Sequence, residues 1–487
     1  MAITRQLIIG GEHVDAASGK TTPDLNPYTG EPYAHVAAAG AEDVRRAVDA
    51  ADGAFAAWSG MRPTERGKIF TRAAEIFEQR RPEAVELMAA ETGGVAGWAQ
   101  FNVGLAADIF RSAAAATTAP RGDVLATDMA GVYSLAVREP YGVVAAISPW
   151  NAPLILGTRA VAIPLAVGNT VVLKPSEDAP IACGLFIADI LLEAGIPEGV
   201  INVITSARAD GPDVVASLIG DDRVRCVNFT GSTNVGRQIG VLAAQHLKPA
   251  VLELGGKNSI VVLKDADIDH AVNASIFGSF MHAGQICMSA DRILVDRTIA
   301  DEFTEKFAAR AAALPAGDPT DPGTVIGPAI NAQSTARQYA LIDDASAKGA
   351  TVLAGGQRHD HGVVPATVLG GVTEDMDVYG QEIFGAITTV FPVADTEAAV
   401  AFANDTPYGL TAGVITENIS EGIQVAQRLK TGIVHVNDQP IADEPMAPFG
   451  GVGNSGYGKF GGQNGIASFT NTRWVTIQQE CHAGYPI

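Results

Sequence analysis

One cysteine of the chain has a setting in which a thiol could react. The stretch HAGQICMSADR, residues 282–292, places Cys287 between a glycine turn and a run that soon becomes apolar. A thiol becomes a catalyst only through neighbours that ionise it and stabilise its adducts, and those must come from elsewhere in the chain. The stretch alone therefore leaves two interpretations open, a catalytic nucleophile and an inert core cysteine.

A second set of polar residues and glycines follows several short β-branched runs. These residues are Ser148, Trp150 and Asn151 in AAISPWN, Lys174, Ser176 and Glu177 in VVLKPSE, Gly231, Ser232 and Gly236 in CVNFTGSTNVG, and Glu253, Gly255 and Gly256 in AVLELGGK. A glycine turn that feeds a helix N-terminus suits a phosphate. Lys174 and Glu177 suit ribose hydroxyls, as an amine donor and a carboxylate acceptor. Singly, a helix cap at Ser232 and a solvated Lys/Glu pair are the simpler readings, but their common place at strand ends favours a nucleotide site.

The elements that would position these residues can be read from the hydrophobic pattern. Residues 41–91 carry apolar residues at helical spacing. From Gly142 onward, near-continuous apolar strands such as GVVAAIS and NTVVLKP alternate with helical segments, which predicts a parallel sheet covered on both faces. A second alternation follows Gly255. We therefore predict an α/β fold with two doubly wound parallel-sheet domains and a small β element for oligomerisation. Within that element, residues 131–140 are expected to form a strand that pairs with another subunit.

Composition narrows the class of protein. The chain has 487 residues and a net charge of −21, which disfavours nucleic acid and anionic membranes as partners. Its four cysteines are scattered, without disulfide or zinc spacing, so we expect no metal site and a reducing cytoplasm. Cys183 and Cys226 are read as core residues, whereas Cys481 remains unassigned. The N-terminal stretch lacks the apolar core of a signal peptide, and no segment is long enough to span a bilayer.

Eight blocks of sequence together resemble the NAD(P)-dependent aldehyde dehydrogenases over nearly the whole chain. They are PWNAP, GNTVVLKPSE, FTGST, LELGGKN, GQICMS, EIFG, NDTPYGL and PFGGVGNSGYGKFGG, in the order typical of that family. The resemblance implies a cofactor-binding domain at 1–118 and 141–254, a catalytic domain at 255–447, and oligomerisation or bridging segments at 119–140 and 448–487. It also implies a homodimer or homotetramer.

The same resemblance assigns roles to individual residues. Cys287 matches the nucleophile, Glu253 the general base and Asn151 the side-chain half of the oxyanion hole. The implied cofactor-binding residues are Ile147, Ser148, Trp150, Lys174, Ser176, Glu177, Gly231, Ser232, Gly236, Leu254, Glu382 and Phe384. NAD is the expected cofactor, with NADP as second choice, because a carboxylate at Glu177 repels a 2′-phosphate.

The chemistry explains why these residue types are needed together. An aldehyde carries no leaving group, so a thiolate must first form a tetrahedral hemithioacetal from which hydride can depart. Asn151 and the Cys287 N–H are expected to stabilise its oxyanion. The product is a thioester, which a water activated by Glu253 releases as the carboxylic acid.

Departures from many relatives point to the substrate. Ala152 stands where a bulky aromatic is common, and Arg159-Ala160 stands where a Trp-Lys pair is common. The run from Pro149 to Lys174 resembles the salicylaldehyde, vanillin and benzaldehyde dehydrogenases. We therefore predict an aromatic aldehyde substrate, in a pocket formed by Trp98, Phe101, Ala152, Arg159, Ile286 and Phe449. Trp98 is expected to stack on the ring and Arg159 to meet a ring hydroxyl or carboxylate; alternatively, Trp98 is a core residue and Arg159 belongs to a structural ion pair.

Two other functions remain open from the sequence. One is the oxidation of aliphatic aldehydes or semialdehydes, and the other is a catalytically silent structural or binding protein on the same fold. Intact Cys287, Glu253 and Asn151 argue against the silent protein. A coenzyme-A-acylating enzyme is disfavoured because Glu253 would hydrolyse the thioester that such an enzyme must preserve.

Overall fold

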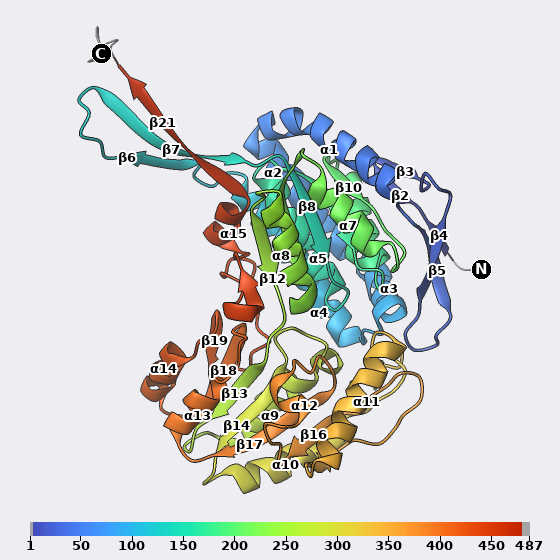
Figure 1. Ribbon diagram of the computed structural model, residues 1–487, viewed down its shortest axis with the longest axis vertical. Helices are drawn as coiled ribbons and strands as arrows, with labels where there is room; N and C mark the ends of the chain where they lie inside the picture. The colour runs from blue at the N-terminus through green and yellow to red at the C-terminus, as the bar shows by residue number, and fades with distance from the viewer. Residues whose placement is uncertain (1–2, 480–487) are drawn as a thin grey trace.

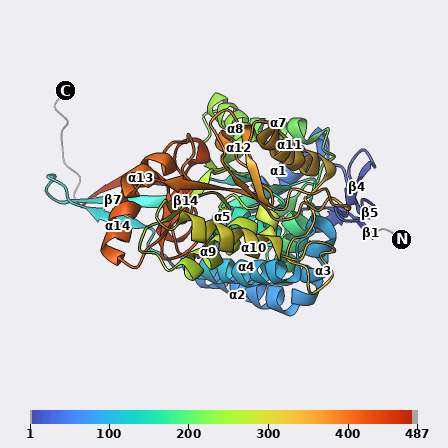
Figure 2. The ribbon, with the colours of Figure 1, turned by 90° about the horizontal axis from the view of Figure 1, so that it is seen from below.

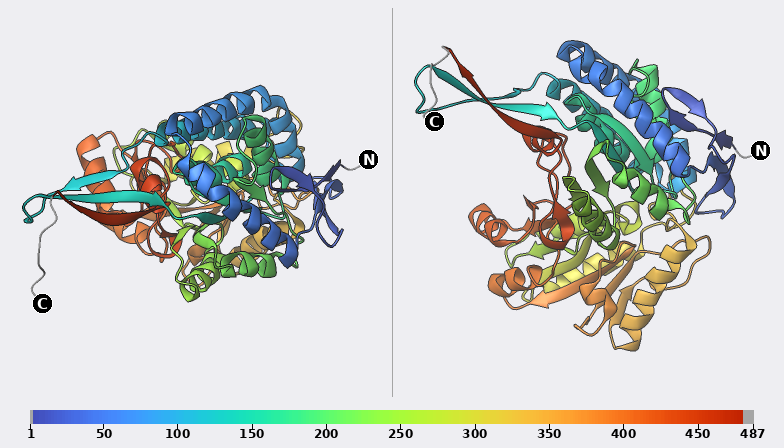
Figure 3. Two further views of the ribbon diagram at one scale, coloured as in Figure 1. Left: turned by 90° about the horizontal axis from the view of Figure 1, so that it is seen from above. Right: turned by 45° about the horizontal axis from the view of Figure 1, so that its top comes forward.

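The structure of the chain, a computed structural model, describes residues 3–479. Two large β-sheets with helices on both faces form the body, and a narrow β arm projects from it (Figures 1 and 3). The predicted α/β class is confirmed. No helix within residues 3–479 is long and apolar enough to cross a membrane.

The first large sheet has five central parallel strands and antiparallel strands at both edges. Its order is β20 (Gly456–Tyr457), β12 (Ala250–Glu253), β11 (Val224–Thr230), β8 (Val143–Ser148), β9 (Thr170–Pro175), β10 (Ile201–Val203), β2 (Leu7–Ile9) and β3 (Glu12–Val14). The predicted strand runs thus become neighbours, and their carboxyl ends meet at one edge. One strand was not expected here, because β20 comes from the segment assigned to oligomerisation.

Helices cover both faces of this sheet, as alternation along its strands requires. Val143 and Ala145 of β8 face one helical layer, whereas Val144 and Ala146 face the other. The first layer contains α1 (Ala41–Gly60) and α7 (Gly211–Gly220), with α8 (Thr233–Gln245) over β11 and β12. The second contains α2 (Pro63–Gln79), α3 (Arg81–Thr92), α4 (Ala96–Ala116), α5 (Pro153–Ala166) and α6 (Phe186–Glu193). Figure 2 shows α1, α7 and α8 on the side opposite to α2 and α4.

The second large sheet is parallel except at one edge. Its order is β15 (Thr351–Ala354), β16 (Thr367–Gly370), β17 (Ile387–Val393), β14 (Ala290–Asp296), β13 (Asn258–Val262), β18 (Thr411–Ile415) and β19 (Ile433–Val436). One face packs on α9 (Ile268–Phe280) and α10 (Ala300–Ala312); the other packs on α11 (Ala332–Ala347), α12 (Asp377–Gly380), α13 (Thr396–Ala403) and α14 (Ile419–Arg428). Both predicted doubly wound sheets are therefore present.

Two small sheets complete the fold. β1 (Ile3–Arg5), β5 (Pro32–Ala37) and β4 (Thr21–Leu25) form one, and β21 (Thr470–Gln478), β7 (Val132–Pro140) and β6 (Gly122–Leu125) form the arm. A short helix, α15 (Gly462–Ser468), leads into β21. The predicted strand at 131–140 is β7, and it pairs with β21 of the same chain over its full length. Its pairing with another subunit and the predicted domain boundaries stay predictions, and residues 480–487 of the last segment, with Cys481, lie outside the described residues.

Candidate active site

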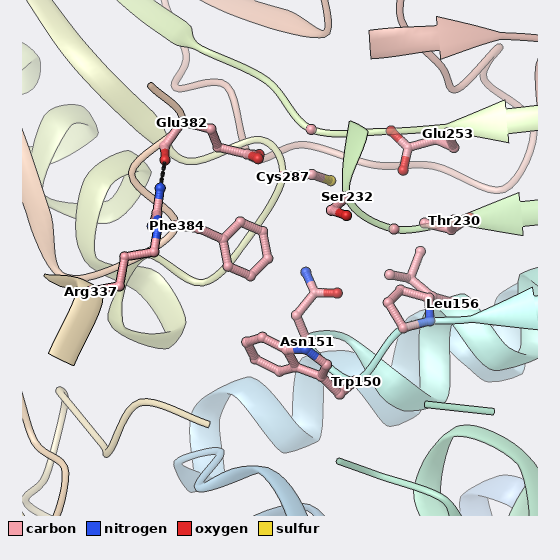
Figure 4. Close-up of a pocket in the computed structure, with 13 residues that line it drawn as sticks. Trp150, Asn151, Leu156, Thr230, Ser232, Glu253, Cys287, Arg337, Glu382 and Phe384 are labelled. Atoms are coloured by element: carbon pink, nitrogen blue, oxygen red, sulfur yellow. Dashed lines mark hydrogen bonds between the residues drawn. The ribbon is translucent and has the colours of Figure 1, made fainter. Parts of the chain in front are cut away.

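The three residues predicted to carry the chemistry line one cavity between the two large sheets. Asn151 follows β8, Glu253 ends β12, and Cys287 lies in the loop before β14. The cavity has a volume of about 330 Å³, and Figure 4 shows Cys287 between Glu382 and Glu253, with Asn151 below it in this view. Its remaining lining residues are Pro149, Trp150, Leu156, Thr230, Gly231, Ser232, Gly255, Arg337, Glu382 and Phe384. The carboxyl ends of the first sheet thus face the nucleophile loop of the second.

The loop that carries Cys287 has an unusual backbone. His282 and Ala283 have φ of 49° and 52°, in the left-handed region that side chains other than glycine seldom adopt, and Gly284 follows at 69°. Asn258 holds the backbone of Cys287 in place, because its Nδ2 donates to the Cys287 carbonyl at 2.7 Å. Such strain is maintained only where the surroundings hold it, and it concentrates at functional sites.

The electrostatic setting keeps the resting thiol protonated. Burial, followed by the negative charges of Glu253 and Glu382, raises the pKa of Cys287 well above its ordinary value. Cys183 and Cys226 are buried, and burial raises the pKa of each to about 12. Their prediction as core residues is confirmed, and Cys287 alone of the three lines the cavity.

Glu253 has the properties of a general base. Its side chain is 2% exposed, and neither carboxyl oxygen has a hydrogen-bond partner among residues 3–479. Burial raises its pKa to about 8, while the positive charge of Arg159 acts in the opposite direction. A base with free lone pairs and a pKa near neutrality is suited to take a proton from water.

A second cavity of about 490 Å³ continues from the first and holds most of the predicted cofactor-binding residues. The two cavities share Pro149, Trp150, Thr230, Gly231 and Ser232. Ile147, Ser148, Lys174, Ser176 and Glu177 line the second cavity beside them. Leu254 and Gly236 do not line it; they pack against each other, and a Cβ on Gly236 would lie 2.2 Å from a Leu254 methyl carbon.

The simpler readings of two cofactor residues also hold in the structure. Ser232 is the N-cap of α8, and its side chain accepts a bond from the Val235 N–H at 3.4 Å. Lys174 and Glu177 form an ion pair, and Glu177 also accepts a 3.4 Å bond from Ser206. Ser232, Lys174 and Glu177 nevertheless line the second cavity.

Glu382 and Phe384 are held by contacts that the sequence did not reveal. Glu382 accepts the Gly256 N–H at 2.9 Å, and burial raises its pKa to about 7. Arg337 donates to the Glu382 carbonyl, the dashed line in Figure 4, and to the Ile383 carbonyl at 2.5 Å. Arg337 lies on α11, where no local motif marks it. Phe384 meets the Trp150 ring edge to face, with centroids 5.6 Å apart.

A buried ion pair also supports the segment that carries Glu382 and Phe384. Asp291 Oδ2 accepts the Ile383 N–H at 2.9 Å and lies 3.1 Å from the Lys257 ammonium nitrogen. Glu382 is also closely packed against Gly255, since a Cβ on Gly255 would lie 2.3 Å from a Glu382 carboxyl oxygen. Asp291 stands four residues after Cys287, so the strand that follows the nucleophile also anchors the residues expected to place the nicotinamide.

None of the six predicted substrate residues lines either of these two cavities. Trp98, Ala152, Ile286 and Phe449 instead belong to one buried apolar cluster, and Cys287 packs at its border. Phe101 is 41% exposed and stacks on Trp98. The Trp98 indole is only 2% exposed and also stacks on His282, so little of the ring surface is left for the predicted stacking on a substrate.

Arg159 is engaged within the protein. Its Nη2 lies 2.5 Å from Asp443 Oδ2, and its guanidinium stacks on the Phe449 ring at 4.4 Å. The adjoining cavity, of about 10 Å³, has room for about one water molecule. The structural ion pair named as an alternative is thus present, and contact of Arg159 with a substrate stays a prediction.

Comparison with known proteins agrees with this arrangement. Residues 13–475 match the model of the Aldehyde dehydrogenase family. The chain is 48% identical over 472 residues to a vanillin dehydrogenase of Pseudomonas fluorescens, with 97% of each chain covered. It is 41% identical over 474 residues to a salicylaldehyde dehydrogenase of Pseudomonas sp. strain C18, covering 97% of this chain and 98% of that one.

A solved structure is similar over the full length. The crystal structure of a salicylaldehyde dehydrogenase from Pseudomonas putida G7, complexed with salicylaldehyde, superposes with a TM-score of 0.97 at 40% identity and covers 100% of both chains. With a family match over nearly the whole chain and the cysteine, glutamate and asparagine gathered at one cavity, this chain belongs to the aldehyde dehydrogenase family.

Proposed function

We propose that this chain oxidises an aromatic aldehyde of the benzaldehyde, vanillin or salicylaldehyde type to its carboxylic acid, with NAD preferred over NADP. The observation that carries the proposal is one cavity where Cys287, Asn151 and the carboxyl of Glu253, which has no partner within residues 3–479, meet beside a buried apolar cluster. An apolar wall beside the thiol favours a weakly polar substrate. The names of the similar proteins support the same class.

The described residues fit a dinucleotide. Ser232 caps α8, and the N-terminal end of this helix faces the second cavity, where it suits a phosphate. Lys174 and Glu177 stand at the end of β9, where an amine and a carboxylate can hold ribose hydroxyls. Glu382 and Phe384 line the cavity of Cys287, so they would hold the nicotinamide end. When bound, the nicotinamide supplies the acceptor for hydride.

The chain's own residues perform the remaining steps. The Cys287 thiol gives its proton to solvent water in the cavity, and the thiolate sulfur attacks the aldehyde carbon. The C–S bond forms as the carbonyl π bond breaks, and the carbonyl oxygen becomes an oxyanion. The Asn151 amide and the Cys287 N–H donate to that oxyanion; one such donor typically contributes ~10²–10³ in rate. Loss of hydride leaves a thioester on Cys287. Glu253 takes a proton from water, whose oxygen attacks the thioester carbon, and the acid leaves as the thiol is regenerated.

The preference for NAD rests on Glu177. Its carboxylate can accept bonds from both adenosine ribose hydroxyls and repels a 2′-phosphate, whereas Lys174 attracts that phosphate. Because the two charges are already paired with each other, we expect the discrimination to be incomplete.

The test is kcat/KM for benzaldehyde, vanillin, salicylaldehyde, hexanal and succinic semialdehyde with both cofactors. Aromatic aldehydes with NAD should give the highest values, and a preference for hexanal or the semialdehyde would contradict the proposal. Ala152→Phe sharpens the test, because Ala152 belongs to the apolar cluster beside Cys287. A misplacement of ~1 Å can cost ~10²-fold, so the added ring should harm aromatic aldehydes far more than hexanal. Equal losses would assign Ala152 to packing alone.

We also propose that the chain forms a homodimer or homotetramer through its β arm. The arm projects from the body (Figures 1 and 3) and exposes large apolar side chains, namely Val124, Leu125, Tyr133, Trp474 and Ile477. Exposed apolar side chains on a projecting sheet are typical of a subunit interface. Light scattering after size-exclusion chromatography should give a multiple of the 50.3 kDa chain mass; a monomer at micromolar concentration would contradict this.

A further inference from the structure

Trp98 touches two separate parts of the catalytic machinery. Its indole Nε1 donates to the backbone carbonyl of Asn151 at 3.2 Å. The same ring stacks on His282, with centroids 5.3 Å apart and planes inclined by 16°. Asn151 follows a strand of the first large sheet, whereas His282 starts the left-handed turn that leads to Cys287 in the second. One rigid ring from α4 therefore contacts both segments.

The contact with His282 acts on a strained part of the backbone. The His282 Nε2 has no hydrogen-bond partner among residues 3–479, and burial lowers its pKa to about 3, so the ring is neutral and held mainly by stacking. The turn is also closely packed at Gly284, where an added Cβ would lie 2.0 Å from the Gly385 carbonyl oxygen. A turn of this kind keeps its shape only while its neighbours fill the space around it.

We propose that Trp98 is a positioning residue for the oxyanion site. In this account, which rests on the proposed function, the indole holds the Asn151 segment and the Cys287 loop at a fixed separation. The two oxyanion donors come from these two segments and must meet one oxygen atom. A misplacement of ~1 Å between reacting groups can cost ~10²-fold in rate, so a brace between the segments affects the chemical step directly.

A purely structural role and a substrate-stacking role predict different behaviour. With Phe101 stacked at 5.6 Å and His282 at 5.3 Å, the Trp98 indole is only 2% exposed. A substrate-stacking residue would affect aromatic aldehydes alone, and mainly through KM. A core residue would change stability and leave kcat unchanged. A positioning residue changes kcat for every aldehyde by the same factor.

The chain offers a matched control in Trp58. This indole is also buried, at 1% exposure, and its Nε1 donates to the Leu165 carbonyl at 3.0 Å, but its ring packs against Phe70 instead of His282. Trp58→Phe and Trp98→Phe therefore remove the same kind of bond, and both should lower Tm by a similar few degrees. We expect Trp98→Phe to lower kcat about tenfold for benzaldehyde and hexanal alike, with KM for NAD within about twofold. Trp58→Phe should keep kcat within about twofold.

A double-mutant cycle shows whether Trp98 acts through Asn151. Asn151→Ala alone should lower kcat by ~10²–10³, and adding Trp98→Phe should lower it no further. Acetylation by 4-nitrophenyl acetate without cofactor forms an oxyanion on the same thiol, so release of 4-nitrophenolate should show the same pattern. Wild-type kcat in Trp98→Phe, or multiplying effects in the double variant, would refute the positioning role. Wild-type kcat in Asn151→Ala would instead refute the proposed role of Asn151.

A second variant covers the case in which Trp98→Phe does not fold. His282→Leu keeps the indole N–H but removes the stacked ring, and we expect kcat to fall several-fold with unchanged KM for NAD. His282→Phe restores an aromatic stack and should restore kcat to within about threefold of wild type. Equal kcat in His282→Leu and wild type would contradict the brace, because the Cys287 loop would then hold its shape without Trp98.

Discussion

The two ends of the proposed cofactor cleft hold their carboxylates in opposite ways. At the proposed adenosine end, Glu177 is paired with Lys174 and accepts a further bond from Ser206. At the proposed catalytic end, Glu253 is buried with both oxygens unpartnered within residues 3–479, and burial raises its pKa to about 8. Both residues lie at the carboxyl ends of strands of one sheet, Glu253 as the last residue of β12 and Glu177 two residues after β9. Under the proposed function, a carboxylate at this position of the fold serves binding where it is hydrogen-bonded and proton transfer where it is not.

Glu382 lies between these extremes. One of its oxygens accepts the Gly256 N–H, and burial raises its pKa only to about 7. A carboxylate that must bind a hydroxyl benefits from being fixed beforehand, whereas a base that must accept a proton needs free lone pairs and a pKa near the working pH. Four predictions test this contrast.

Removal of the nucleophile has the largest expected effect. Cys287→Ala should abolish NADH formation, to below a few per cent of wild type, because no covalent adduct can form. NAD affinity should change little, since the second cavity does not contain Cys287. Steady-state NADH production and titration of bound NADH by fluorescence measure the two quantities. Substantial dehydrogenase turnover in the variant would remove Cys287 from the mechanism.

Glu253→Gln should slow thioester hydrolysis by about 10²-fold or more while sparing hydride transfer, since general base catalysis typically contributes 10²–10⁴-fold. A burst of about one NADH per active site should precede slow turnover, provided that the thiol ionises without Glu253. The wild-type deacylation rate should rise from pH 6, reach half its maximum near pH 8 and level off above about pH 9, because the carboxyl with a pKa of about 8 acts as a base only when ionised. Loss of this rise in Glu253→Gln, seen in single-turnover assays, would support the assignment; unchanged steady-state turnover would assign another base.

Arg159→Leu breaks the buried pair with Asp443 beside Glu253. Removal of one partner leaves a buried charge, so the free energy of unfolding should fall by about 3–5 kcal/mol. The exposed pair of Arg428 and Glu397 is the control, and Arg428→Leu should cost at most about 1 kcal/mol.

The same change should move the deacylation profile. The charge of Arg159 lowers the pKa of Glu253, so its loss should raise that pKa further and shift the rise in rate to higher pH. Unchanged stability, combined with a selective loss of rate for hydroxylated or carboxylated benzaldehydes, would favour the substrate contact instead.

Glu177→Gln should have the smallest effect. It removes the charge that repels a 2′-phosphate while leaving Lys174 in place, so kcat/KM with NADP should rise several-fold relative to NAD. Glu177→Asp, which keeps the charge, is the matched control. If wild type already prefers NADP, or if the ratio does not move, Glu177 does not select the cofactor.

Local sequence patterns predicted the central framework well. The runs GVVAAIS and NTVVLKP became β8 and β9, and the glycine turn in CVNFTGSTNVG leads from β11 into α8. Strand period, helix period and glycine turns are local properties, and parallel strands share one carboxyl edge. From these patterns the strand-end residues Lys174, Ser232 and Glu253 could be expected together, and the structure places them along one continuous cleft.

Only the tertiary structure decided which of these polar groups have hydrogen-bond or ion-pair partners, and which residues those partners are. The partner of Arg159 is Asp443, 284 residues away, and Trp98 reaches Asn151 across 53 residues. Neither pairing leaves a mark in the local pattern, since it depends on how α4, α5 and the loop before β20 pack. The types of the reactive residues and the alternation of strands and helices are thus written in the sequence. Packing leaves the Glu253 carboxyl oxygens without partners within residues 3–479, pairs Arg159 with Asp443 and stacks Trp98 on His282. These features depend on burial and long-range contacts, which exist only once the chain is folded.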